Sequence, residues 1–169
     1  MTDREIKFVD VQMWSSSKEV KDAINECLNL GYMSGGLIGK KLEEQLCQKY
    51  NFKNFSTVVN GTAALHLSLI SLGVEKNDYV VSPNLTFVST ASSILMAGAK
   101  PILVDVQDDG NIDLDSVEEA CIKHKVKVVI AVHLYGNPCN INRLLELSKK
   151  YGFKIIEDCS QAIGSSFEN

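Results

Sequence analysis

The sequence predicts an α/β fold built on a mostly parallel β-sheet. From about residue 55 onward, short runs of β-branched residues alternate with segments of helical periodicity, which is the pattern of βαβ units. A chain of 169 residues with 45% apolar residues also has the size and composition of one globular domain with a real core. We therefore expect a helical lead-in over residues 1–54 and an α/β domain over residues 55–169.

Five strands are predicted within the α/β domain, and four helices lie between them. The expected strands are FSTVV (55–59), YVVSP (79–83), PILVDV (101–106), VKVVIAV (126–132) and FKIIED (153–158). The expected helices cover residues 63–73, 86–98, 113–123 and 141–152. Asp113 or Asp115 is the expected N-cap of the third helix.

The lead-in is expected to contain two amphipathic helices separated by a glycine-rich bend. The first helix is predicted over residues 17–31 and the second over residues 40–51, where Leu42 and Leu46 lie one turn apart. The sequence MSGGLIG forms the bend between them.

Charge and composition exclude several classes of function. The net charge is −4 and the basic residues are scattered, so no basic stripe would follow a nucleic-acid backbone. No apolar stretch approaches the roughly 20 residues of a membrane span, and the polar N-terminus has no signal-peptide core, so a cytoplasmic protein is expected. The five cysteines and three histidines show no metal-ligand spacing, so no metal is predicted.

Ligands of open α/β sheets bind beyond the carboxyl ends of the strands, so the residues that follow each strand are the candidates for a site. After residues 55–59, Asn60, Gly61, Thr62 and Ala63 lead directly into a predicted helix. Glycine permits close approach of the backbone, and the start of a helix favours an anion, so this turn is a candidate phosphate site. The simpler alternative is that Asn60 or Thr62 only caps the helix.

An aromatic residue, an acid and an amide follow later strands. Phe87 comes after residues 79–83 and either lies flat against a ligand ring or packs in the core. Asp158 ends an apolar strand, where a carboxylate should either have a cationic partner or be protonated. A protonated pyridine nitrogen is such a partner. Gln161 would then donate to a ring hydroxyl or steer the ligand. The alternative is that Asp158 caps the following turn and Gln161 is solvated.

His133 and Tyr135 follow the strand over 126–132, and their alternation predicts that they share one face. A buried hydrogen-bonded pair and a direct ligand contact both remain open for them. Taken together, an anion cradle, an aromatic residue and an acid with an amide describe a site for pyridoxal phosphate, which has a phosphate, a ring face and a ring nitrogen.

In their order and spacing, several stretches of this sequence resemble the DegT/StrS-type nucleotide-sugar aminotransferases. These stretches are NGTAALHLSLISLGVEKNDYVVSPNLTFVSTASSIL, KPILVDV, VVIAVHLYGNP and IIEDCSQAIGSSFEN. YMSGGLIGKKLEEQL resembles the family's stretch near the sugar-nucleotide site. The family comprises fold-type I pyridoxal-phosphate enzymes, so the resemblance implies their three-layer, mostly parallel large domain, incomplete at the C-terminus.

The resemblance assigns roles by position. Residues 61–63 match the phosphate-binding turn, Phe87 matches the aromatic residue that stacks on the pyridine ring, and Asp158 matches the acid at the pyridine nitrogen. Gln161 matches the amide at the ring hydroxyl. Four residues are candidates for contact with the substrate: Ser34, Gly35, His133 and Tyr135.

The resemblance implies transfer of an amino group, from a donor such as glutamate, to a nucleotide-linked keto sugar. The products of this family enter lipopolysaccharide, O-antigen and other surface polysaccharides, and the enzymes are homodimers. The family's Schiff-base lysine is expected beyond Asn169, in a Ser/Thr-Lys segment, and no lysine of this sequence matches it. Because that amine holds the cofactor and moves the proton, we expect this chain alone to be inactive.

Three alternatives to this aminotransferase remain. A histidine in place of the lysine would make the complete protein a dehydratase. A truncated product without the lysine would be non-catalytic. A nicotinamide-dependent oxidoreductase is disfavoured because the sequence lacks the GxGxxG pattern.

Overall fold

The computed structural model describes residues 17–31 and 36–167. The chain forms two compact units, which divide between residues 57 and 58. The predicted boundary after residue 54 remains a prediction.

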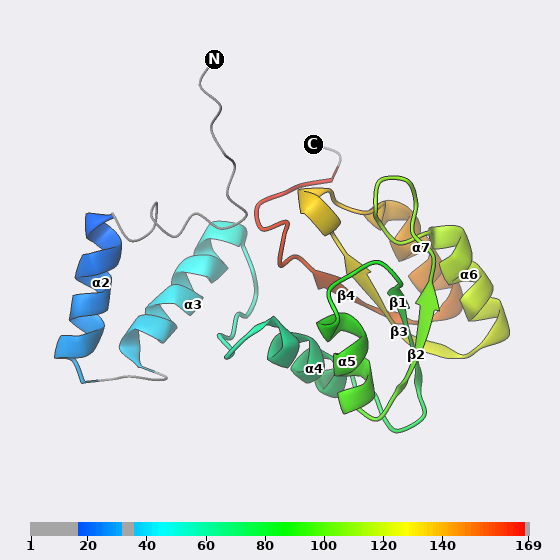
Figure 1. Cartoon of the computed structure of the whole chain (residues 1–169), viewed down its shortest axis with the longest axis horizontal. Coiled ribbons are helices and arrows are strands. Elements are labelled where there is room, and N and C mark those ends of the chain that lie inside the picture. The colour runs from blue at the N-terminus through cyan, green and yellow to red at the C-terminus, as the bar shows by residue number, and fades with distance from the viewer. Residues whose placement is uncertain (1–16, 32–35, 168–169) are drawn as a thin grey trace, which may run out of the picture. The chain divides into compact units, whose positions relative to one another are not determined.

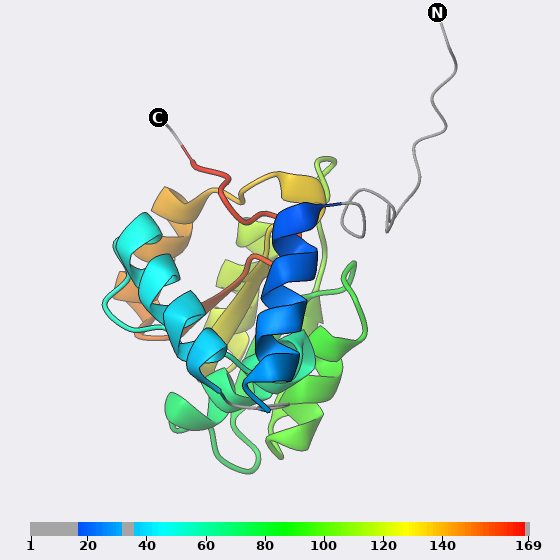
Figure 2. The ribbon, with the colours of Figure 1, turned by 90° about the vertical axis from the view of Figure 1, so that its left-hand side faces the viewer.

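The first unit contains the two predicted helices, α2 (Lys18–Asn29) and α3 (Leu37–Tyr50) (Figure 2). The bend expected over residues 33–39 is wrong at its end, because Leu37, Ile38 and Gly39 already belong to α3. Ser17 caps α2 by accepting a hydrogen bond from the backbone N–H of Val20. After α3, three rings stack in sequence, with centroids 5.6 Å and then 6.3 Å apart; they belong to Tyr50, Phe52 and Phe55.

The second unit is built on a four-stranded sheet in which all strands are parallel (Figure 1). In chain order the strands are β1 (Tyr79–Pro83), β2 (Lys100–Val104), β3 (Val126–Val132) and β4 (Lys154–Asp158). Their order in the sheet is β2-β1-β3-β4, so the carboxyl ends of all four strands lie at one edge. The register places Val132 opposite Asp158, and the N–H of His133 donates to the carbonyl of Asp158 at 3.1 Å.

Helices cover both faces of this sheet. One apolar cluster joins α4 (Gly61–Ser71) and α5 (Ser89–Met96) to the sheet, and a second joins α6 (Leu114–Lys123) and α7 (Ile141–Tyr151) to the opposite face (Figure 1). The three-layer, mostly parallel α/β class is therefore confirmed. No helix in the described ranges has the length and apolar character needed to span a membrane.

The expected strand over residues 55–59 is wrong, because the structure has no strand there. Val59 is 87% exposed and Val58 is 42% exposed, so these β-branched side chains lack the packing that gives such residues their strand preference. The structure also shows where two of the predicted helices begin. Asp113, not Asp115, caps α6, and the helix expected from residue 86 begins at Ser89.

Candidate functional site

The predicted cofactor residues of the second unit gather at the carboxyl edge of the sheet. Asp158 is the last residue of β4, and its Oδ1 accepts a hydrogen bond from the Ser160 hydroxyl at 2.6 Å. That same hydroxyl oxygen lies 3.7 Å from the position of a Cβ built on Gly61, the first residue of α4. The phosphate turn and the acid predicted from the sequence are therefore neighbours in the fold.

Asn60 forms the N-cap of α4. Its backbone is extended, and its Oδ1 accepts a hydrogen bond from the N–H of Ala63 at 2.9 Å. The helix-cap alternative is thus correct for Asn60, and Thr62 is not the cap. The cap does not use the N–H groups of Gly61 and Thr62. These two groups lie at the positive end of an 11-residue helix, where an anion is favoured.

The Thr62 hydroxyl is linked to the start of α5. Its Oγ1 lies 2.7 Å from Oγ of Ser89, and either oxygen can donate. If Thr62 donates to an anion at the start of α4, Ser89 must donate to Thr62. No sequence pattern connects these two hydroxyls, so Ser89 was not among the residues predicted from the sequence.

Phe87 lies just before α5, and its side chain is 73% exposed. The alternative in which it packs in the core is therefore wrong. Because it has little contact with the described residues, its ring face is accessible to a planar ligand.

Among residues 17–31 and 36–167, the carboxylate of Asp158 is hydrogen-bonded through one of its two oxygens. Oδ1 accepts hydrogen bonds from both the N–H and the hydroxyl of Ser160, at 3.0 Å and 2.6 Å. The turn-capping alternative therefore describes one role of Asp158. These two bonds do not involve Oδ2, which can accept from a ligand.

The amide of Gln161 is oriented by a backbone group. Its Oε1 accepts a hydrogen bond from the N–H of Tyr135 at 2.8 Å. The amide nitrogen is then the end that faces outward, so Gln161 can donate to a ligand oxygen. The side chain is exposed, but it is not solely solvated as the alternative supposed.

His133 and Tyr135 do not share a face, so that prediction is wrong. β3 ends at Val132, and the strand alternation does not continue beyond it. Tyr135 adopts a left-handed conformation with φ 57°, and its side chain is 76% exposed. His133 is buried.

The imidazole of His133 is bonded at both nitrogens. The backbone N–H of Cys139 donates to Nδ1 at 3.1 Å, so the proton resides on Nε2, which donates to Oε2 of Glu157 at 3.0 Å. This hydrogen bond lowers the pKa of the Glu157 carboxyl, against the opposing effect of burial. His133 is thus a buried residue held in place by two hydrogen bonds, and its partner Glu157 was not predicted from the sequence.

A cavity of about 290 Å³ lies next to this pair, on the sheet face opposite Asp158. Alternation along β4 turns Glu157 toward the face covered by α7 and Asp158 toward the face covered by α4 and α5. The lining residues are His133, Pro138, Ile141, Glu157, Cys159, Ala162, Ser165 and Phe167. None of the predicted cofactor residues is among them.

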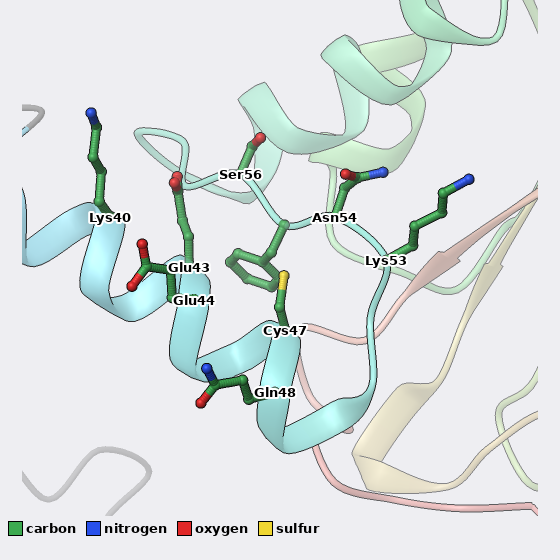
Figure 3. Close-up of a pocket in the computed structure, with 9 residues that line it drawn as sticks. Lys40, Glu43, Glu44, Cys47, Gln48, Lys53, Asn54 and Ser56 are labelled. Atoms are coloured by element: carbon green, nitrogen blue, oxygen red, sulfur yellow. The ribbon is translucent and has the colours of Figure 1, made fainter.

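In the first unit, a hollow of about 550 Å³ lies between α3 and the segment that follows it (Figure 3). Figure 3 shows that two lysines, Lys40 and Lys53, and two glutamates, Glu43 and Glu44, lie around it. The carboxylate of Glu43 accepts hydrogen bonds from the N–H and hydroxyl of Thr57, at 2.7 Å and 2.8 Å. These two hydrogen bonds therefore attach α3 to the segment of residues 53–57, beside the hollow. The substrate candidates Ser34 and Gly35 lie outside the described residues.

Comparison with known proteins identifies the same architecture. GDP-perosamine synthase from Escherichia coli O157:H7 is 34% identical over 165 residues, which make up 96% of this chain and 45% of that protein. NtdA from Bacillus subtilis, solved with its cofactor PMP, is 30% identical with a TM-score of 0.86, covering 97% of this chain and 39% of that one. A protein from Streptococcus pneumoniae, described as a sugar aminotransferase and solved in a PLP form, is 30% identical with a TM-score of 0.78. It covers 85% of this chain and 41% of that one.

This chain spans less than half the length of the curated relatives that it matches. The model of the DegT/DnrJ/EryC1/StrS aminotransferase family matches residues 15–169, almost the entire chain. The chain belongs to the DegT/DnrJ/EryC1/StrS aminotransferase family.

Proposed function

We propose that this chain forms the cofactor-binding part of a pyridoxal-phosphate-dependent aminotransferase that acts on a nucleotide-linked keto sugar. The observation that carries the proposal is that the start of α4 borders Ser160, which is bonded to Asp158 at the end of β4, while the exposed Phe87 follows β1 at the same edge of the sheet. When bound, the cofactor supplies an electron sink that lets an amino group pass between two carbon atoms.

The residues at this edge suit the three parts of pyridoxal phosphate. The N–H groups of Gly61 and Thr62, with the Thr62 hydroxyl, would hold the phosphate dianion at the positive end of α4. Gly61 has no side chain to fill the space between this helix start and Ser160. The backbone at residues 61–63 would therefore approach the phosphate closely.

The ring would be held by three side chains. Phe87 would stack on its face and exclude water, and Oδ2 of Asp158 would accept a proton shared with the pyridine nitrogen. A carboxylate at that position keeps the ring nitrogen protonated. Gln161, whose Oε1 is held by Tyr135, would donate its amide N–H to the ring hydroxyl.

The substrate class rests on the relatives. The name GDP-perosamine synthase belongs to proteins from Escherichia coli and Vibrio cholerae that are 34% identical to this chain. We propose that the complete protein takes an amino group from an amino-acid donor, glutamate by resemblance, and delivers it to a nucleotide-linked keto sugar for a surface polysaccharide such as lipopolysaccharide O-antigen. Exposed apolar side chains on α4 and α5, including Leu67 and Leu95, suit the proposed homodimer.

The cofactor part of this proposal can be tested with the chain itself. Pyridoxal phosphate is titrated into the purified protein, and binding is followed by equilibrium dialysis and by the absorbance of the cofactor. We expect saturable binding that is competed by inorganic phosphate. Asp158→Ala should weaken binding about tenfold or more, because a hydrogen bond to a charged group is lost.

Asp108→Ala is the matched control, because this exposed acid lies in the turn after β2. It should leave the affinity unchanged. The proposal fails if wild-type protein binds pyridoxal phosphate no more tightly than inorganic phosphate, or if the two alanine variants behave alike.

A further inference from the structure

We propose that Ser160 is a positioning residue of the cofactor site, whose hydroxyl fixes the carboxylate of Asp158 so that Oδ2 faces the ring nitrogen. This inference rests on the proposed function and adds a residue to it. It comes from the hydrogen bonds at the end of β4 and from the contact between Ser160 and the start of α4.

Two donors of Ser160 meet on one oxygen of Asp158. The backbone N–H donates at 3.0 Å and the hydroxyl donates at 2.6 Å, both to Oδ1. A carboxylate held at one oxygen by two donors cannot rotate to present that oxygen elsewhere without losing both bonds. Its other oxygen, Oδ2, is thereby directed away from the turn.

The second contact of Ser160 lies at the phosphate end of the site. Its Oγ is 3.7 Å from the position of a Cβ built on Gly61, which begins α4. One hydroxyl thus touches the acid for the ring nitrogen and borders the turn for the phosphate. Pyridoxal phosphate carries both a ring nitrogen and a phosphate group, so it could use both of these neighbouring groups.

The hydroxyl has a distinct contribution that can be isolated. Replacement by alanine removes the 2.6 Å bond but keeps the backbone N–H bond to Oδ1, so the turn itself can still form. Asp158 then keeps its charge but is held by one donor. We expect Ser160→Ala to lower the binding affinity only for ligands that interact with Asp158 through a ring nitrogen.

The test compares pyridoxal phosphate with its deaza analogue, in which a C–H group replaces the ring nitrogen. Ser160→Ala should weaken binding of pyridoxal phosphate about five- to tenfold, which corresponds to one lost hydrogen bond. The same variant should bind the deaza analogue and inorganic phosphate as wild-type protein does. A purely structural role would weaken all three ligands together.

Two further variants separate the hydroxyl from the shape of the side chain. Ser160→Thr keeps the hydroxyl and should retain wild-type affinity for pyridoxal phosphate. Valine has nearly the same shape as threonine but lacks the hydroxyl, so Ser160→Val should behave like Ser160→Ala. Ser71→Ala is the control, because this exposed serine at the end of α4 donates only to helix carbonyls.

The outcomes distinguish this inference from the proposed function. If wild-type protein binds pyridoxal phosphate and Asp158→Ala does not, while Ser160→Ala binds it normally, the positioning role is overturned and the proposed function stands. Equal losses for pyridoxal phosphate and its deaza analogue also overturn it. If wild-type protein does not bind pyridoxal phosphate, both fail together.

Discussion

Nε2 of His133 lies 3.0 Å from Oε2 of Glu157. The His133 side chain is 5% exposed, whereas the Glu157 side chain is 49% exposed. The hydrogen bond from His133 lowers the pKa of the Glu157 carboxyl, although burial opposes the shift. A carboxyl whose pKa is lowered in the folded state stabilises the fold above its unfolded pKa. That contribution is lost as the pH falls through the folded-state pKa.

Glu157→Gln should therefore lower the free energy of unfolding at pH 7 by about 0.5–1 kcal/mol, a small value because half of the carboxylate faces water. The deficit should shrink as the pH falls through the lowered pKa of the wild-type carboxyl, because the carboxyl then becomes protonated. Urea unfolding at pH 7 and at an acidic pH measures it. Glu146→Gln, at an exposed position of α7, is the control. A deficit that is the same at both pH values contradicts this account of the pair.

Phe87 should matter for binding and not for stability. Because its side chain is 73% exposed, Phe87→Ala should change the free energy of unfolding by no more than about 0.5 kcal/mol. It should weaken pyridoxal-phosphate binding roughly fivefold through lost ring stacking. Leu69→Ala is the converse control: this residue is fully buried, so its truncation should cost about 2–5 kcal/mol of stability. A large stability loss at Phe87 would show that the ring is packed.

Asn60 allows the helix cap and the anion site to be separated. Asn60→Asp keeps an oxygen that can accept from the N–H of Ala63, and its charge suits the start of a helix, so stability should be kept or rise by about 0.3–1 kcal/mol. The same charge should repel inorganic phosphate and weaken its binding. Chemical unfolding and phosphate titration give the two readouts.

The control for this change is Asn140→Asp, which makes the same substitution at the N-cap of α7. It should not affect phosphate binding. Unchanged phosphate affinity in Asn60→Asp would mean that the anion does not bind at the start of α4.

Tyr135 carries backbone strain that glycine should relieve. Its φ of 57° lies in the left-handed region, which costs a residue with a side chain roughly 1–2 kcal/mol. Tyr135→Gly relieves this strain and should raise the free energy of unfolding by up to about 1 kcal/mol. The gain is smaller than the strain because glycine loses more conformational entropy on folding. Thermal and urea unfolding measure the change. Tyr135→Ala removes the ring without relieving the strain and should not be stabilised; if both variants gain equally, the ring and not the backbone is responsible.

The four strands of the sheet could be predicted because each is a short β-branched run between helices of clear periodicity, as in residues 126–132. The expected strand over 55–59 has the same composition and failed, because strand preference depends on neighbours that the sequence does not specify. Composition alone could not distinguish the two cases.

The residues of the candidate site were likewise only partly predictable from the sequence. Asp158 and Thr62 could be identified because they directly follow segments expected to be strands. Ser89 could not, because its hydroxyl meets Thr62 across 27 positions of the chain. The hydrogen bond between Gln161 and the N–H of Tyr135 depends equally on tertiary structure, since the chain turns sharply after β3.

Glu157 and Asp158 are adjacent carboxylates that point to opposite faces of β4. A slip of β4 by one residue against β3 would exchange them, placing Glu157 at the proposed cofactor site and Asp158 beside His133. The apolar residues before them oppose such a slip only weakly, because Ile155 and Ile156 are both apolar and each suits either face. The bond between His133 and Glu157 discriminates between the two alignments. It therefore fixes the register that places Asp158 at the proposed cofactor site, although it lies on the other face of the sheet.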